Sequence, residues 1–184
     1  MLAEHEGNWR MQAAILSWHD YFLTIAAVSA TLAGLLFVGL TISLSHMLQG
    51  YGYLSRAFTA LFIQFEMLLI GLFGIVPLQP GWVLGGEFIV AGAAILAGIS
   101  VFPYNFPENE QSHVLGSKGP RRVRAMLAYA GTLLPVLAGI GLIAGDTRAL
   151  YLLIPSEIAC LYLSFGNAWV FAVEIPRRAA LKVD

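Results

Sequence analysis

Three glutamates stand inside long apolar stretches of the sequence, and they are the residues best suited to chemistry. They are Glu66, Glu87 and Glu157. No lysine or arginine lies within the interior of these stretches. Because a bare buried carboxylate is very costly, each carboxyl must be protonated, hydrated, hydrogen-bonded or bound to a cation. Acidic side chains at membrane depth commonly mark proton or cation pathways.

The last apolar stretch carries its polar residues along one helical face. Steps of three and four residues join Glu157, Cys160, Ser164, Asn167, Phe171 and Glu174. Such steps place side chains on one stripe of a helix. This stripe either lines a hydrated path or joins helices or subunits by hydrogen bonds. We therefore add Ser164 and Asn167 to the three glutamates as candidate residues of an ion pathway or ion-binding site.

The acidic residues are expected to converge toward one side of the membrane. Glu87 and Glu157 fall in the outer halves of their stretches, Asp20 falls at the outer rim, and Glu66 lies deeper. If the helices face one another, these four side chains form an acidic funnel that concentrates cations.

Other chemistries find little support in the residues. No C-x-x-C, H-E-x-x-H, G-x-S-x-G or phosphate-loop motif occurs, so we expect no enzymatic activity. Retinal would need a lysine in a span, and His19 and His46 lie at opposite ends of one helix, where they cannot clasp one haem. We expect no cofactor, while the residues leave open whether a metal ion binds. A net charge of -1 gives no basic field for nucleic acid.

The elements that position these side chains are expected to be membrane-spanning helices. Of the 184 residues, 58% are hydrophobic and 11% are charged, which is too little polar surface to coat a soluble domain. A spanning helix needs roughly twenty apolar residues. Five stretches qualify, and the fold class is therefore all-α, a polytopic bundle of five transmembrane helices. The stretches are 21–48, 55–78, 82–102, 124–145 and 150–173.

Three regions follow from this division of the chain. Residues 1–20 mix aromatic, aliphatic and polar side chains and predict an amphipathic segment at the interface. Residues 21–176 form one membrane domain, and residues 177–184 form a basic tail. Small residues at every fourth position in the first span, Ala26, Ala30 and Gly34, predict a helix seam.

The basic residues predict the orientation of the bundle. Arg10 and Arg148 fall on the side of the N-terminus. Eight others fall on the opposite side, namely Arg56, Lys118, Arg121, Arg122, Arg124, Arg177, Arg178 and Lys182. Because basic residues favour the cytoplasmic face, we expect the N-terminus outside and the C-terminus in the cytoplasm.

The first half of the chain resembles a group of small bacterial multi-pass membrane proteins. The likeness lies in Trp18-His-Asp-Tyr-Phe-Leu, in the run from Ala33 to Leu44, in Arg56-Ala57, in Pro77 and in Gly85-Gly86-Glu87. Members of that group are labelled as modulators of the membrane-anchored ATP-dependent protease. The resemblance implies a multi-pass protein of the bacterial inner (plasma) membrane with an accessory role and no catalytic residues.

The sequence therefore leaves two functions open. The first is a cation or proton channel or small transporter, expected to be homo-oligomeric because five short helices leave little room for a polar path in one subunit. The second is a non-catalytic accessory protein that docks on a membrane protease or another membrane complex. In that case the polar groups join helices, and Glu108, Glu110 and His113 in the polar loop are the expected contact.

Overall fold

The computed structural model describes residues 9, 11–47, 51–101 and 118–180. It is all-helical. Its main elements are α2 (His19–Met47), α3 (Tyr51–Ile75), α4 (Gly81–Val101), α5 (Lys118–Ile143), the 3-10 helix η3 (Thr147–Leu152), α6 (Leu153–Trp169), the π-helix η4 (Val170–Glu174) and α7 (Ile175–Ala180).

The prediction of five apolar helices is confirmed. Those long and apolar enough to cross a membrane cover His19–Leu44, Arg56–Ile75, Gly81–Val101, Val123–Ile143 and Thr147–Arg177. The first four match the predicted stretches to within a few residues. The fifth is longer than predicted, because η3, α6, η4 and α7 follow one another without a break.

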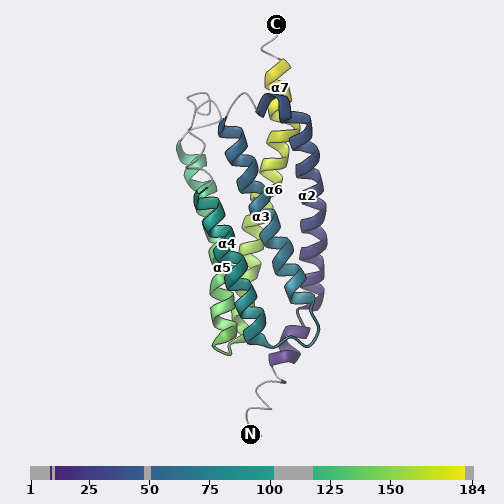
Figure 1. Cartoon of the computed structure of the whole chain (residues 1–184), viewed down its shortest axis with the longest axis vertical. Coiled ribbons are helices and arrows are strands. Elements are labelled where there is room, and N and C mark those ends of the chain that lie inside the picture. Colours follow the sequence, from purple (N-terminus) through teal and green to yellow (C-terminus); the bar gives the residue numbers. More distant parts are fainter. Residues whose placement is uncertain (1–8, 10, 48–50, 102–117, 181–184) are drawn as a thin grey trace.

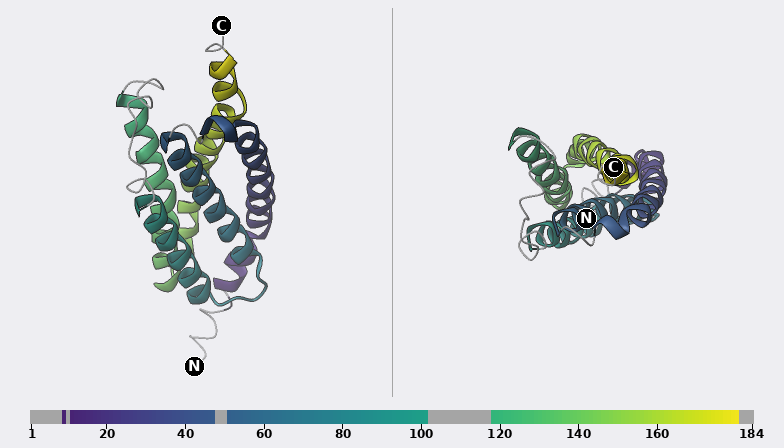
Figure 2. Two further views of the ribbon diagram at one scale, coloured as in Figure 1. Left: turned by 45° about the horizontal axis from the view of Figure 1, so that its top comes forward. Right: turned by 90° about the horizontal axis from the view of Figure 1, so that it is seen from above.

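The helices form one elongated bundle, with the long axes of α2 to α6 roughly aligned (Figure 1). The chain pairs α2 with α3 and α4 with α5, and α6 contacts α2, α3 and α5. Seen from above, the yellow-green α6 lies beside both α2 and α5 (Figure 2). Side chains from all five helices can therefore meet in the interior of the bundle.

The two ends of the bundle differ in charge. One end, called here the basic end, holds the start of α3 with Arg56, the start of α5 from Lys118 to Arg124, and α7 with Arg177 and Arg178. The other end, called here the turn end, holds the short connections at 76–80 and 144–146. Arg148 in η3 lies there. The described basic residues are thus separated between the two ends as five membrane spans require. The side of the membrane that each end faces stays a prediction.

Both connections at the turn end contain a residue with positive φ. Gly145 has φ of 87° and Leu78 has φ of 56°. Glycine adopts such a conformation without steric cost, whereas a leucine is strained there. Leu78 lies between Pro77 and Pro80, which restrict the backbone on both sides. These short connections hold α3 against α4 and α5 against η3.

A short helical segment before α2 covers the turn end. Residues 11–16 are helical, and the side chain of Ile15 is buried against the bundle, whereas Trp9 and Leu16 are exposed. Met11 fills the space beside the backbone of Gly81. This division into a buried and an exposed face agrees with the amphipathic pattern predicted for residues 1–20, of which residues 1–8 and 10 lie outside the described part.

Glycines set the closest helix approaches. A Cβ on Gly139 of α5 would overlap the backbone oxygen of Gly85 in α4, and a Cβ on Gly85 would lie 2.5 Å from the oxygen of Gly139. A Cβ on Gly71 of α3 would lie 2.7 Å from the backbone nitrogen of Ala26. Within the predicted seam, Ala26 therefore lies in a helix contact, whereas Gly34 has open space around it.

Substituting alanine for Gly139 should force α4 and α5 apart. Because the clash is with backbone, which cannot rotate away, we expect a loss of about 1–3 kcal/mol in unfolding free energy. Gly86→Ala is the matched control, since a Cβ there meets nothing within 4 Å. Thermal unfolding in detergent measures both. Equal unfolding temperatures for the two variants would contradict the close approach of α4 and α5 at Gly85 and Gly139.

Candidate functional site

Glu66 and Glu157 are both buried in the interior of the bundle, within range of each other's charge. Glu66 comes from α3 and Glu157 from α6, and their side chains are 1% and 2% exposed. Their carboxyls are close enough for a direct charge interaction. Glu66 lies ten residues from Arg56 at the start of its span, which is about 15 Å along a helix and near the midplane of the membrane. The pair is called here the carboxyl pair.

Four helices, α3 to α6, form the walls around the carboxyl pair. A Cβ on Gly92 of α4 would lie 3.5 Å from Oε1 of Glu66 and 3.2 Å from the backbone oxygen of Thr132 in α5. Cys160, one turn from Glu157 on α6, is buried within charge-interaction range of both carboxyls. A Cβ on Gly131 of α5 would lie 2.7 Å from its Sγ. The absence of a side chain at Gly92 and Gly131 lets α3, α4, α5 and α6 converge here.

The carboxyl pair has no hydrogen-bond partner within the described part of the chain. Both oxygens of Glu66 and both of Glu157 are buried without one, and the same holds for the hydroxyl of Tyr21. The Thr132 hydroxyl is beside Glu66, but it donates to the backbone oxygen of Ala128 at 3.0 Å. Buried polar atoms nearly always have partners. Five orphan oxygens in one region therefore make this a candidate functional site.

Between the carboxyl pair and the basic end lies a closed hydrogen-bond network around Gln64. Its Nε2 donates to the backbone oxygen of Ser29 at 2.8 Å and to the Ser29 hydroxyl at 3.1 Å. Its Oε1 accepts from the Ser164 hydroxyl at 2.7 Å. Gln64 thus joins α2, α3 and α6. The sequence pattern does not single out Gln64 as a site residue, although an amide two residues from Glu66 in an apolar span is a visible signal.

Gln64→Leu should destabilise the bundle modestly. The leucine fills a similar volume but leaves the hydroxyls of Ser29 and Ser164 without the amide. Interhelical hydrogen bonds in membranes contribute on average about 0.6 kcal/mol each, so we expect a total loss of about 1–2 kcal/mol. Thr31→Val is the control, because that exposed hydroxyl bonds only the carbonyl one turn back on its own helix. Thermal unfolding of both variants in detergent is the measurement, and a loss no larger than that of the control would contradict the role given to Gln64.

Closer to the basic end, Asn167 of α6 holds Arg56 of α3. The guanidinium Nε of Arg56 donates to Oδ1 of Asn167 at 2.7 Å. Asn167 is buried, and Arg56 is partly buried. One turn further along, in the π-helical η4, the backbone oxygen of Phe171 accepts from the Ser43 hydroxyl of α2. The predicted stripe on α6 therefore does face the bundle interior, and Ser164 and Asn167 are hydrogen-bonded there.

These groups follow one another along the bundle axis. Their order from the basic end to the turn end follows the chain direction of α3 and the reverse of the chain directions of α2 and α6. We call this series the polar column. Its members are Arg56 with Asn167, then Ser29, Gln64 and Ser164, then Glu66 with Glu157, and finally the hydroxyl of Tyr21.

The predicted acidic funnel is not assembled in the described structure. Glu87, half-buried near the start of α4, accepts a hydrogen bond from Nε2 of Gln79 at 2.5 Å. Asp20 is exposed. The expectation assumed that the outer half of α4 turns Glu87 toward Glu157, whereas the connection after α3 supplies Gln79 as a nearer partner. The loop residues Glu108, Glu110 and His113 lie outside the described residues.

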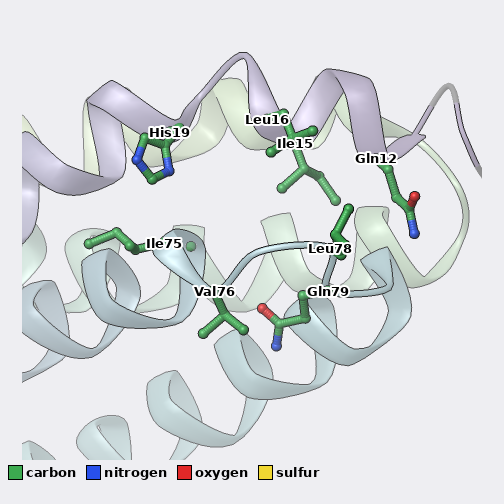
Figure 3. A pocket seen from close by; sticks show the side chains of 9 residues that line it. Gln12, Ile15, Leu16, His19, Ile75, Val76, Leu78 and Gln79 are labelled. Carbon is green, nitrogen blue, oxygen red and sulfur yellow. The ribbon is translucent and has the colours of Figure 1, made fainter.

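A small pocket lies at the turn end, separate from the carboxyl pair. Figure 3 shows it between the segment before α2 and the connection after α3, with Gln12 and His19 on one side and Gln79 on the other. Most of its other lining is aliphatic. Neither glutamate of the carboxyl pair lines it.

The described residues contain no group of three histidine, cysteine, aspartate or glutamate side chains arranged to hold a metal ion. Comparison of the chain with protein-family models, with curated proteins and with solved structures finds no match. The function is therefore inferred from the geometry of the polar column, and the resemblance to protease modulators stays a prediction.

Proposed function

We propose that this chain is an integral membrane protein that moves protons or other small cations across the bilayer. The carboxyl pair is the ion-binding site in this proposal. The single observation that carries it is the burial of Glu66 and Glu157 together, without hydrogen-bond partners, in the interior of five helices long enough to span a membrane.

The energetic cost of the carboxyl pair supports a ligand. Two like charges in one low-dielectric site repel each other, and each ionised carboxyl loses its hydration. The column gives Arg56 a partner in Asn167, which lies nearly three helical turns, or about 15 Å, from the carboxyl pair. A bound proton or cation offsets these costs directly. If the two side chains served packing alone, two apolar side chains of similar volume would make the bundle more stable.

The column supports a transporter or a gated channel more than an open pore. Gln64 uses its Oε1 and both donors of its amide in the hydrogen bonds to Ser29 and Ser164. Arg56 and Asn167 hold each other closer to the basic end. An ion that leaves the carboxyl pair toward the basic end must displace these bonds. Movement of α6 relative to α3 would open the Gln64–Ser164 and Arg56–Asn167 bonds together, because both of these bonds join the two helices.

A homo-oligomer was expected from the sequence because one subunit offers little room. The site described here is built from α2 to α6 of a single chain, so the proposed transport does not require a second copy. Whether copies associate stays a prediction, which cross-linking in native membranes would test.

The second candidate is a non-catalytic accessory protein on a membrane protease or another membrane complex. The observation that favours it is the closed set of hydrogen bonds made by Ser164 and Asn167. Those bonds join helices as a purely structural role requires. The orphan carboxyl pair is what this candidate leaves unexplained.

Reconstitution separates the two candidates. Purified protein in liposomes is given an inward gradient of protons, sodium or potassium, and uptake is followed with a dye specific for each. The proposal expects uptake of at least one ion above that of protein-free liposomes. Absence of all three, together with co-purification of a partner at a fixed ratio, would overturn transport and support the accessory role.

A further inference from the structure

Tyr21 has a buried hydroxyl that the proposed function has not yet used. Its ring belongs to α2 and packs against the cluster that contains Cys160. Its hydroxyl is within charge-interaction range of Glu157 and, like the carboxyl pair, is buried without a hydrogen-bond partner. We infer that Tyr21, Glu66 and Glu157 form one site and that its ligand is a proton, not a metal ion. This inference rests on the proposed function.

The orphan atoms are complementary to protons. Two ionised carboxylates present only acceptors, and the Tyr21 hydroxyl is the one orphan donor among these groups. One added proton gives the carboxyl pair a hydroxyl that donates to the neighbouring carboxylate. Once the Glu157 side chain moves within reach, the Tyr21 hydroxyl, which makes no hydrogen bond in the structure, donates to it, and each of the three groups then has a partner. Protons therefore satisfy this site without a coordination shell.

A metal ion fits the same surroundings poorly. Calcium takes six to eight oxygen ligands and magnesium requires a near-octahedral set. Within the described residues no third acid or histidine joins the carboxyl pair. The backbone oxygens around it belong to continuous helices, where they accept helical hydrogen bonds.

The titratable groups around the site can be named helix by helix. Tyr21 comes from α2, Glu66 from α3, and Glu157 with Cys160 from α6. At this level α4 contributes Gly92 and α5 contributes Thr132, neither of which titrates. Among the residues that the structure describes, no lysine, arginine or histidine interacts with the carboxyl pair.

Aromatic contacts hold the Tyr21 ring in place. Trp18 meets it edge to face, with ring centroids 5.2 Å apart, and also meets Tyr151 at 5.0 Å. The ring of Phe22 lies 5.9 Å from that of Tyr21. Such contacts fix the direction of the hydroxyl. Because Tyr21 is the last member of the polar column toward the turn end, it is the group through which protons reach the carboxyl pair from that side.

The first test removes metal ions from the flux measurement. Wild-type protein in liposomes is given a proton gradient in buffer whose only other cation is N-methyl-D-glucamine, with a chelator present, and sodium and potassium uptake are measured separately. The inference expects proton uptake that is unchanged without metal ions. Uptake of sodium or potassium without protons would overturn the inference and leave the proposed function standing. Absence of every flux would overturn both.

The second test addresses Tyr21 itself. Tyr21→Phe removes only the hydroxyl and should lower proton uptake by about fivefold or more. Tyr151→Phe is the matched control, because Tyr151 contacts the same Trp18 but is exposed, and it should retain wild-type uptake. Equal thermal unfolding of the two variants shows that each is folded. Wild-type uptake by a folded Tyr21→Phe protein would overturn the role of Tyr21.

Discussion

Replacing Glu66 by glutamine is expected to lower ion uptake by proteoliposomes by about tenfold or more, and Glu157→Gln is expected to do the same. Glutamine keeps the size of the side chain but cannot take up or release a proton. Because the two carboxyls share one ligand, removing either one abolishes the site. The double variant should therefore be no slower than either single variant, as for residues that act as one unit.

Glu87→Gln is the control for these two substitutions. Glu87 is bonded to Gln79 in the connection after α3 and lies outside the site as built here, so its variant should transport at the wild-type rate. Independent losses that multiply in the double variant would contradict a shared site. A loss in Glu87→Gln equal to that in Glu66→Gln would favour the acidic funnel instead.

Replacing Glu66 by lysine is expected to give a folded protein that does not transport. The new ammonium lies beside the Glu157 carboxylate and forms an ion pair in the interior, so the positive charge that the site otherwise binds is attached to the chain. Removing the partner from such a pair leaves a bare buried charge, which costs about 3–5 kcal/mol. Glu66→Lys with Glu157→Gln should therefore be less stable than Glu66→Lys alone by that amount.

Thermal unfolding of the single and double variants measures this coupling without any transport assay. Glu157→Lys, in which Glu66 is retained, provides a second version of the same test, with Glu66→Gln as its added substitution. If the double variants with glutamine unfold at the same temperature as the single lysine variants, the side chains at positions 66 and 157 do not face each other.

Much of the architecture follows from composition and spacing. Twenty-residue apolar stretches can only cross lipid as helices, and the prolines and glycines at 77–81 and 145 mark the ends where the chain reverses. The polar stripe on α6 follows from helical periodicity alone. Glu157, Cys160, Ser164 and Asn167 are all buried in the bundle, as their three- and four-residue steps predict.

The partners of those side chains could not be predicted, because partner choice depends on how neighbouring helices are rotated and shifted along their axes. Ser164 bonds Gln64, and Asn167 bonds Arg56. No spacing within α6 encodes these pairs. Arg56 was assigned by the sequence to the basic face alone, yet its long side chain also reaches into the bundle, as long basic side chains at helix ends can.

Glu66 and Glu87 show again that the sequence does not reveal the partners of a side chain. Both are acids in apolar stretches, and sequence alone gives them equal standing. Close helix approaches at Gly92 and Gly131 leave room for Glu66 to lie in the interior beside Glu157. The turn after α3 instead brings Gln79 to Glu87. Backbone geometry therefore separates a buried carboxyl pair from a hydrogen-bonded acid at the turn end.

The most direct test of the central claim compares wild-type protein with the Glu66→Gln, Glu157→Gln double variant in metal-free proteoliposomes under an inward proton gradient. Our account predicts acidification of wild-type vesicles well above the protein-free leak, and only the leak rate for a double variant that unfolds at or above the wild-type temperature. Equal acidification by the two proteins would contradict it.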